Sequence, residues 1–352
     1  MRKPAGRAMR ARLEAMLQSC WWQPAPNALA WALGPLSWVY RGLLALHGRR
    51  AAQPVALPVP VLVVGNHVVG GAGKTPTVIA LVQALQAAGH HPGVISRGHG
   101  REGAEAVAVT DASTAAAVGD EPLLIRRRCG VPVWVGRQRP EVALQLCAAH
   151  PEVDVLVADD GLQHRALARQ AEVVVFDERG AGNGLLLPAG PLREPLPTNV
   201  PAMRRVLYTA GAASTRLPGV MATRRLGLAW PLAAWQRGDA TQTLPLQQLR
   251  GRPLLAAAGM AAPEKFFTML AAAGLRFERL PLPDHHSYTT LPWPADTPEL
   301  LVTEKDAVKL QPEAVGSARV WVLPLDLQLP AGLVDELSTL LFPPPPLRPA
   351  AP

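Results

Sequence analysis

The sequence is poor in cysteine. Only Cys20, Cys129 and Cys147 are present among 352 residues, and none of them belongs to a CxxC pair. A structural zinc site usually needs such closely spaced pairs, and a disulfide framework needs more cysteines in a shorter chain. Both are therefore excluded as organising features, and the composition fits a reducing compartment.

Positive charge is scarce outside the N-terminus. The chain carries a formal net charge of +8, yet residues 1–50 alone hold eight basic residues against a single acidic one, Glu14. The rest of the chain is therefore close to neutral. A nucleic-acid-binding protein more often carries a basic stripe with interleaved aromatic residues on its main body. We therefore expect no nucleic-acid partner.

The N-terminal region combines basic residues with tryptophan. The segment between Glu14 and Arg41 is uncharged and contains four of the nine tryptophans, Trp21, Trp22, Trp31 and Trp38. Tryptophan and flanking arginine favour the surface of an anionic membrane. Because prolines 24, 26 and 35 interrupt the segment, a continuous span is disfavoured. We expect a helix over about residues 27–47 lying in one leaflet; a buried helix packed on the main domain is the alternative.

A glycine-rich loop follows the apolar run Val59 to Val64, and a helix is predicted from Lys74 to Ala88. Strand, loop and helix in this order are the setting of a P-loop, whose amides and helix N-terminus hold phosphate oxygens. We expect Lys74 to reach the β- and γ-phosphates of ATP and Thr75 to hold Mg²⁺. The predicted nucleotide-binding residues are Gly70, Gly71, Ala72, Gly73, Lys74, Thr75 and Pro76.

Two positions in this loop depart from standard patterns. Val68 stands where the common GxxxxGK[ST] pattern has glycine. Val69 stands where the variant loops of partitioning-type ATPases carry a further lysine. An ATPase switch of the partitioning type, acting at the membrane, stays open as an alternative function at this point.

Apolar runs and helical segments alternate after the loop. We predict strands at residues 94–96, 107–109, 131–135 and 153–158, and helices at 120–129 and 141–149. This βαβ rhythm implies a mostly parallel sheet flanked by helices. Asp159 follows the last of these strands, at the edge where a P-loop fold binds its nucleotide. Aspartate there typically holds Mg²⁺; a helix cap or a solvated turn is the alternative.

A series of longer motifs now resembles one family. VGNHVVGGAGKTP, SRGHG, VGDEPLLI, DDGLQH, RGAGNGLLLPAGPLREP, PDHHSYT and VTEKDAVKL occur in this order. They resemble the tetraacyldisaccharide 4′-kinases of lipid A biosynthesis, and the resemblance runs from about Val59 to about Leu310. The unusual loop is itself a feature of that family, which accounts for Val68.

The resemblance implies a reaction and a place in the cell. The family transfers the γ-phosphate of ATP to the 4′-hydroxyl of an acylated glucosamine disaccharide 1-phosphate, which gives lipid IVA. The implied cofactors are ATP and Mg²⁺. The implied location is the cytoplasmic face of the inner membrane, where the protein is membrane-associated. This agrees with the N-terminal segment, because a kinase with a lipid acceptor must reach the bilayer surface.

The resemblance also implies a base for the sugar hydroxyl. Asp120 and His285 match the family's proposed catalytic dyad, in which a carboxylate orients and stabilises the imidazole that accepts the proton. His286 stays open as the alternative base. Asp284 is expected to support the same site.

Two charged residues in the Gly/Pro-rich segment complete the predicted site. Arg193 is expected to neutralise the γ-phosphate and Glu194 to join the Mg²⁺ shell with Thr75 and Asp159. Taken without the resemblance, Arg193 and Glu194 fit a surface ion pair. Residues 303–306 are placed near the nucleotide without a role.

The expected organisation has four parts. Residues 1–50 form the membrane-associated helical segment, and 51–205 the P-loop α/β domain. Residues 206–342 form a smaller α/β domain that includes a strand near 205–209, and 343–352 a Pro-rich tail. Lys74 and His285 fall in different domains, so we expect the active site in the cleft between them. A kinase of another sugar or lipid, and a non-enzymatic membrane-binding module, are the further alternatives.

Overall fold

The computed structural model describes residues 4–49, 53–101 and 103–344. Its larger sheet has the strand order β3-β4-β2-β5-β1-β6-β7-β8, and β3 runs antiparallel to β4 while the other pairs are parallel. These strands are β1 (Val61–Gly65), β2 (Pro92–Ser96), β3 (Val107–Val109), β4 (Val133–Val135), β5 (Val155–Asp159), β6 (Ala171–Phe176), β7 (Arg204–Tyr208) and β8 (Val220–Met221). The central strands β2, β5, β1 and β6 are buried along their whole length, which explains their apolar sequences.

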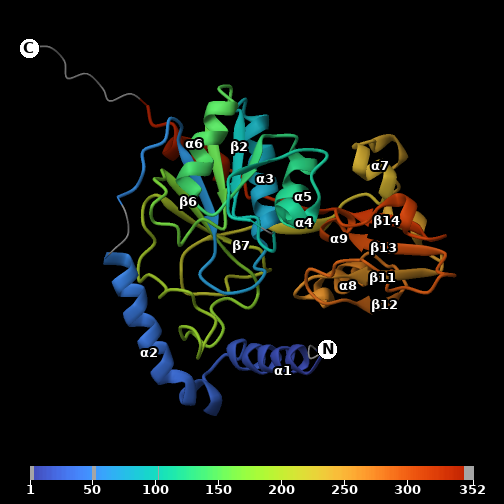
Figure 1. The fold of residues 1–352 in the computed structure, drawn as a ribbon, viewed down its shortest axis with the longest axis horizontal. Helices are drawn as coiled ribbons and strands as arrows, with labels where there is room; N and C mark the ends of the chain where they lie inside the picture. The colour runs from blue at the N-terminus through green and yellow to red at the C-terminus, as the bar shows by residue number, and fades with distance from the viewer. Residues whose placement is uncertain (1–3, 50–52, 102, 345–352) are drawn as a thin grey trace, which may run out of the picture.

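Helices cover both faces of this sheet (Figure 1). They are α3 (Lys74–Ala87), α4 (Ala115–Val118), α5 (Asp120–Cys129), α6 (Arg139–Ala149) and α10 (Leu333–Leu341). Apolar residues of α3, α5 and α10 share one core with the sheet, whereas those of α6 belong to a second core on the opposite face. The predicted P-loop-type α/β architecture is confirmed.

A smaller sheet lies beside the larger one and forms the second α/β unit (Figure 1). Its strand order is β10-β14-β13-β11-β12, and β10 is antiparallel to β14. The elements of this part are β10 (Trp230–Pro231), α7 (Leu232–Arg237), β11 (Leu254–Ala258), α8 (Pro263–Ala272), β12 (Glu278–Pro281), β13 (Glu299–Thr303), α9 (Glu304–Ala307) and β14 (Arg319–Leu323). A two-stranded sheet of β9 (Thr223–Leu226) and β15 (Leu325–Gln328) links the two parts.

Two elements expected in the smaller domain lie in the larger one. The strand predicted near residues 205–209 is β7, which pairs in parallel with β6. Helix α10 packs on α3 and β6. We propose that the larger domain extends through β8 and takes α10 back at the end of the chain. Most of the predicted Pro-rich tail, residues 345–352, lies outside the described residues.

Charged pairs tie the two domains together. Arg128, near the end of α5, contacts both carboxylate oxygens of Glu304 at 2.8 Å and Asp326 at 2.6 Å. Lys265 of α8 contacts the Asp177 carboxylate at 2.7 Å. Glu304 and Asp177 are buried. Removing Arg128 would leave Glu304 without a cation partner, whereas Asp177 would keep Arg179 at 2.7 Å. The Arg128 pair holds α5 against the first turn of α9, and the Lys265 pair holds α8 against the residue that follows β6.

The N-terminus forms two helices, α1 (Pro4–Trp21) and α2 (Ala28–Arg49). Helix α1 was not predicted, although its sequence is rich in good helix formers such as alanine, arginine and leucine. The expectation that proline would interrupt a long helix is wrong for Pro35, which lies inside α2. A single proline removes one backbone hydrogen bond and can be accommodated as a local kink.

Helix α2 packs on the Gly/Pro-rich segment and exposes its other side. Ser37 donates to the carbonyl of Leu186, and the Tyr40 hydroxyl donates to the carbonyl of Arg193 at 2.9 Å. Trp31 and Trp38 are 69% and 78% exposed. Residues 28–48 are long and apolar enough to cross a membrane by length and composition, and only 11% of that window is buried.

Candidate active site

The glycine-rich loop joins β1 to α3 and leaves the first turn of the helix open. Gly70 and Gly73 have φ of +86° and +90°, a backbone conformation that favours glycine. Helix α3 begins at Lys74 and has no side-chain cap, so its first amides are free to hold an anion. The predicted residues 70–76 therefore lie where phosphate groups can bind.

Lys74 lies over this loop and is held by two neighbours. Its Nζ is 3.2 Å from Asn66 Oδ1 and 3.5 Å from Asp160 Oδ1. Its side chain is mostly buried, which strengthens the attraction between the ammonium and a bound phosphate. Thr75, the next residue, is half-buried in the same helical turn.

Asp159 ends β5 next to this lysine and has the environment of a metal ligand. Ser96 Oγ donates to its Oδ2 at 3.2 Å, whereas its buried Oδ1 has no hydrogen-bond partner among the described residues. Burial, reinforced by Glu121 and Asp160, raises the pKa of Asp159 to about 7. A bound cation would satisfy the free oxygen and favour the ionised form.

Glu194, the other predicted carboxylate of a metal shell, is engaged elsewhere. It lies 3.3 Å from His67 Nδ1 and accepts from Gln163 Nε2 at 2.9 Å. Within the described ranges, no group of three or more His, Cys, Asp or Glu side chains could hold a metal ion. A Mg²⁺ ion would therefore need phosphate oxygens in addition to Thr75 and Asp159. The role of Glu194 stays a prediction.

Arg193 reaches the same place from the Gly/Pro-rich segment. Its Nη1 donates to Asp160 Oδ1 at 3.0 Å and to Gln163 Oε1 at 3.2 Å. Although burial opposes it, Lys74 and Arg193 hold the pKa of Asp160 below its usual value. Two cations thus converge on one carboxylate beside the loop. The surface ion pair that the residues alone suggested for Arg193 and Glu194 is not formed; each has another partner.

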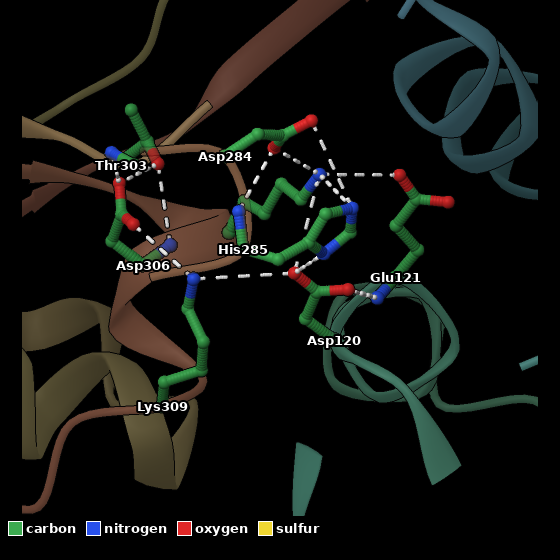
Figure 2. Close-up of polar contacts among 9 residues, drawn as sticks. Asp120, Glu121, Asp284, His285, Thr303, Asp306 and Lys309 are labelled. Carbon is green, nitrogen blue, oxygen red and sulfur yellow. Dashed lines mark hydrogen bonds and ion pairs between the residues drawn. The ribbon is translucent and has the colours of Figure 1, made fainter. Parts of the chain in front are cut away.

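Asp120 and His285 meet across the domain interface. Asp120 is the first residue of α5 in the larger domain and is buried, whereas His285 follows β12 in the smaller one. His285 Nδ1 lies 2.9 Å from Asp120 Oδ2, as Figure 2 shows. His285 adopts φ of +56°, an uncommon conformation for a non-glycine residue. The predicted pair is therefore brought together by contacts between the domains.

The second histidine is turned away from this pair. The His286 ring makes an edge contact with the Tyr288 ring at 4.7 Å, and its buried Nε2 has no partner among the described residues. His285, and not His286, contacts Asp120, so the geometry favours His285 as the base.

The charges around the pair act on both of its members. The hydrogen bond with Asp120 raises the pKa of His285 above its ordinary value, against the effects of burial and of Lys305. Although burial opposes it, the hydrogen bond from His285 and the charges of Lys305 and Lys309 lower the pKa of Asp120. Lys305 Nζ also lies 3.4 Å from His285 Nε2.

Asp159 lies between the phosphate loop and the pair. Asp159 senses the charges of both Lys74 and Glu121, and Glu121 follows Asp120 in α5. The His99 ring, from the segment after β2, lies 5.6 Å from the His285 ring.

Sequence reasoning missed Asn66, His67, Asp160 and Lys309, and it placed Lys305 near the nucleotide without a role. Asp160 carried a signal, because it directly follows a predicted metal ligand at the end of a strand. Lys305 and Lys309 carried another, because residues four apart share one face where the chain is helical. Their pairing with Asp120 depends on the docking of two domains, which sequence spacing does not encode.

Comparison with known proteins places these residues in a wider context. Residues 29–341 match the family model described as tetraacyldisaccharide-1-P 4′-kinase. A tetraacyldisaccharide 4′-kinase of Leptothrix cholodnii is 53% identical over 339 residues, which cover 94% of this chain and 97% of that protein. One of Methylibium petroleiphilum is 51% identical, with coverage of 96% and 97%.

The fold is similar to that of a solved structure. A crystal structure of LpxK from Aquifex aeolicus in complex with ATP superposes with a TM-score of 0.72 at 26% sequence identity. The match covers 89% of this chain and all of the other. The match therefore includes both sheets.

Proposed function

The chain belongs to the tetraacyldisaccharide-1-P 4′-kinase family, and we propose that it carries out the family's reaction with His285 as the base and Asp120 as its orienting partner. It is an ATP-dependent kinase that transfers the γ-phosphate to the 4′-hydroxyl of tetraacyldisaccharide 1-phosphate in lipid A biosynthesis. The observation that supports the proposed base is the 2.9 Å contact between His285 and Asp120 across the domain interface. An ATPase switch needs no such base for a hydroxyl, and that alternative is not favoured.

The proposed proton transfer follows from this contact. His285 Nδ1 donates to Asp120, so the lone pair of Nε2 would accept the proton of the 4′-hydroxyl once the hydroxyl takes the place of Lys305 Nζ, which lies 3.4 Å from Nε2. The sugar oxygen forms a bond to the γ-phosphorus while the bond to the β,γ-bridging oxygen breaks and ADP leaves. The proton remains on His285, where the Asp120 carboxylate stabilises the imidazolium.

The phosphate groups are neutralised from the other side of the site. Lys74 and the amides of the glycine loop would hold the β- and γ-phosphates. Arg193 would exchange its contact with Asp160 for one with the γ-phosphate during transfer. Thr75 and Asp159 would hold Mg²⁺, which would neutralise part of the charge of the phosphate groups.

The acceptor group can be tested with a substrate analogue. We expect the 4′-deoxy analogue of tetraacyldisaccharide 1-phosphate to accept no phosphate, because it lacks the hydroxyl that His285 would deprotonate. Consumption of ATP should also fail to rise when the analogue is added. Phosphorylated lipid obtained from the 4′-deoxy compound would refute the assignment of the acceptor.

We further propose that α1 and α2 hold the enzyme on the cytoplasmic face of the inner membrane. Helix α2 presents exposed Trp31 and Trp38 on one side and contacts the carbonyl of Arg193 through Tyr40 on the other. Exposed apolar surface of this kind marks a membrane or protein contact. The bilayer would thus lie next to the phosphate-binding residues, where a lipid acceptor must arrive.

Binding to vesicles tests this membrane proposal. We expect Trp31→Ala with Trp38→Ala to weaken binding to vesicles with anionic lipids by about tenfold or more. Each substitution removes the apolar area that the indole would bury in the membrane. A matched control is Leu144→Ala with Leu228→Ala, because these leucines are 45% and 47% exposed elsewhere on the surface. The proposal fails when both double variants bind vesicles equally well.

A further inference from the structure

We propose that Lys309 is a positioning residue for the reaction: a buried ammonium that orients the Asp120 carboxylate and keeps it ionised, and that acts on His285 only through it. The inference rests on the proposed function and gives a role to the segment Thr303 to Lys309, for which the sequence motif suggested none. Figure 2 shows this segment facing the pair from the smaller domain.

Lys309 is held inside the protein by charge. Its side chain is 8% exposed, and its Nζ lies 4.0 Å from Asp120 Oδ2 and 3.4 Å from Asp306 Oδ1. The ammonium also lies 5.3 Å from the centre of the Tyr288 ring, within the range of a cation–π contact. It makes no hydrogen bond in the described part of the chain. Since burying an ammonium is costly without compensating charge, the two carboxylates account for its presence.

Asp306 fixes where this ammonium can be. Its Oδ2 accepts from the Gly259 amide at 3.0 Å and from the Thr303 hydroxyl at 2.7 Å, and its side chain is fully buried. A Cβ atom at position 259 would lie 2.6 Å from Asp306 Oδ1, so the carboxylate is closely confined. Asp306 thus keeps Oδ1 available for Lys309. Through Lys309, the buried Asp306 of the smaller domain is linked to Asp120 of the larger one.

Lys305 also lies near Asp120, but it differs from Lys309 in its exposure and in its contacts. Its Nζ is also 4.0 Å from Asp120 Oδ2, but its side chain is 20% exposed and also contacts Asp284 at 3.2 Å and His285 Nε2 at 3.4 Å. Lys305 therefore contacts the base directly and is partly exposed to solvent. Of the two members of the pair, Lys309 contacts only Asp120. Because both side chains are buried, solvent screens the attraction between them only weakly.

Removal of the Lys309 charge is expected to shift the protonation of His285 in one direction. The charged and titratable groups that face the pair or Lys309 are His99, Glu121, Asp284, Tyr288, Lys305 and Asp306, and His286 lies behind Tyr288. Without Lys309, the Asp120 carboxylate is offset by one cation fewer and stabilises protonated His285 more strongly. The base therefore loses its free lone pair at a higher pH. Asp120 also loses the contact that aims it, and a misplaced catalytic group lowers kcat.

The test compares Lys309→Met with two references in the full-length enzyme, assayed with ATP and tetraacyldisaccharide 1-phosphate in detergent micelles. We expect kcat to fall by about ten- to a hundredfold, with KM for ATP unchanged and with the acidic limb of the kcat profile moved to higher pH. Lys309→Arg should retain most activity because it keeps the charge. Arg276→Met, which removes an exposed cation of the same domain, should leave both quantities unchanged.

A double-mutant cycle separates this role from a structural one. In an Asp120→Asn background, Lys309→Met should cause little further loss, because the cation acts through Asp120. An equal loss in both backgrounds, or an acidic limb that does not move, overturns the proposal. If Lys309→Met does not fold, Asp306→Asn replaces it: Lys309 is then free to move toward Asp120, so the limb should move to lower pH, and an unmoved limb refutes the proposal.

Failure of this inference can be told from failure of the proposed function. A wild-type enzyme that transfers phosphate while Lys309→Met behaves like Arg276→Met sinks the inference alone. A wild-type enzyme that transfers no phosphate to the lipid sinks the proposed function as well.

Discussion

His285→Ala is expected to lower kcat by about 10³-fold with little change in KM for ATP. A positioned base contributes about 10²- to 10⁴-fold to such a reaction. His285 Nε2 is the nitrogen that Asp120 does not engage, and Lys305 Nζ lies 3.4 Å from it. His286→Ala is the matched control, because His286 packs on Tyr288 and not on Asp120. Equal losses in the two variants would contradict the choice of His285.

The contact between His285 and Asp120 can be tested with a double variant. Because the two side chains act as a unit, Asp120→Asn combined with His285→Ala should be little worse than His285→Ala alone. Asp120→Asn alone should also shift the acidic limb of kcat to lower pH. The hydrogen bond with Asp120 is what raises the pKa of His285, so its loss lets the ring stay neutral in more acidic solution. Losses that add fully in the double variant would argue against a dyad.

Lys74→Met is expected to lower kcat by about 10²- to 10³-fold, in line with the loss of one preorganised charge from a phosphoryl-transfer site. The variant keeps the length of the side chain and removes its ammonium. Asp160 would retain Arg193 at 3.0 Å, so we expect the fold to persist. Steady-state transfer of phosphate to lipid measures the effect.

Lys74→Arg is the informative companion to this variant. A guanidinium is planar and larger than an ammonium, so it should not replace the point charge over the loop even though the net charge is kept. Thermal unfolding of both variants, followed with and without ATP, reports whether nucleotide still binds. Near-normal transfer by Lys74→Met would show that the loop lysine has no part in catalysis.

The sequence predicted best those strands and helices that depend only on local residues. The buried strands β1, β2 and β5 and the helix that begins at Lys74 follow from apolar runs and glycine placement, and the structure confirms them within a few residues. Strand β6 was missed although it is also apolar. It lies between the motifs DDGLQH and RGAGNGLLLPAGPLREP, which were analysed for site residues and not for secondary structure. The predicted P-loop residues lie on the turn between β1 and α3 and in the first turn of that helix, and their role in nucleotide binding stays a prediction.

The remaining features depend on contacts between distant segments. The strand β7 was assigned to the smaller domain because it follows the long irregular segment, yet its hydrogen bonds go to β6. Lys309 reaches Asp120 only because Arg128 and Glu304 help dock α5 against α9. No periodicity or spacing in one chain encodes such docking, whereas the family resemblance identified Asp120 and His285 without it.

The central claim is that the phosphate held by the loop is delivered to a lipid sugar. The most direct test incubates the full-length enzyme in detergent micelles with ATP labelled at the γ-phosphate, Mg²⁺ and tetraacyldisaccharide 1-phosphate. The label is then measured separately in lipid and in inorganic phosphate. We predict that nearly all label appears in the lipid, at the 4′-position. Label released as inorganic phosphate at a rate that does not depend on the lipid would contradict the account.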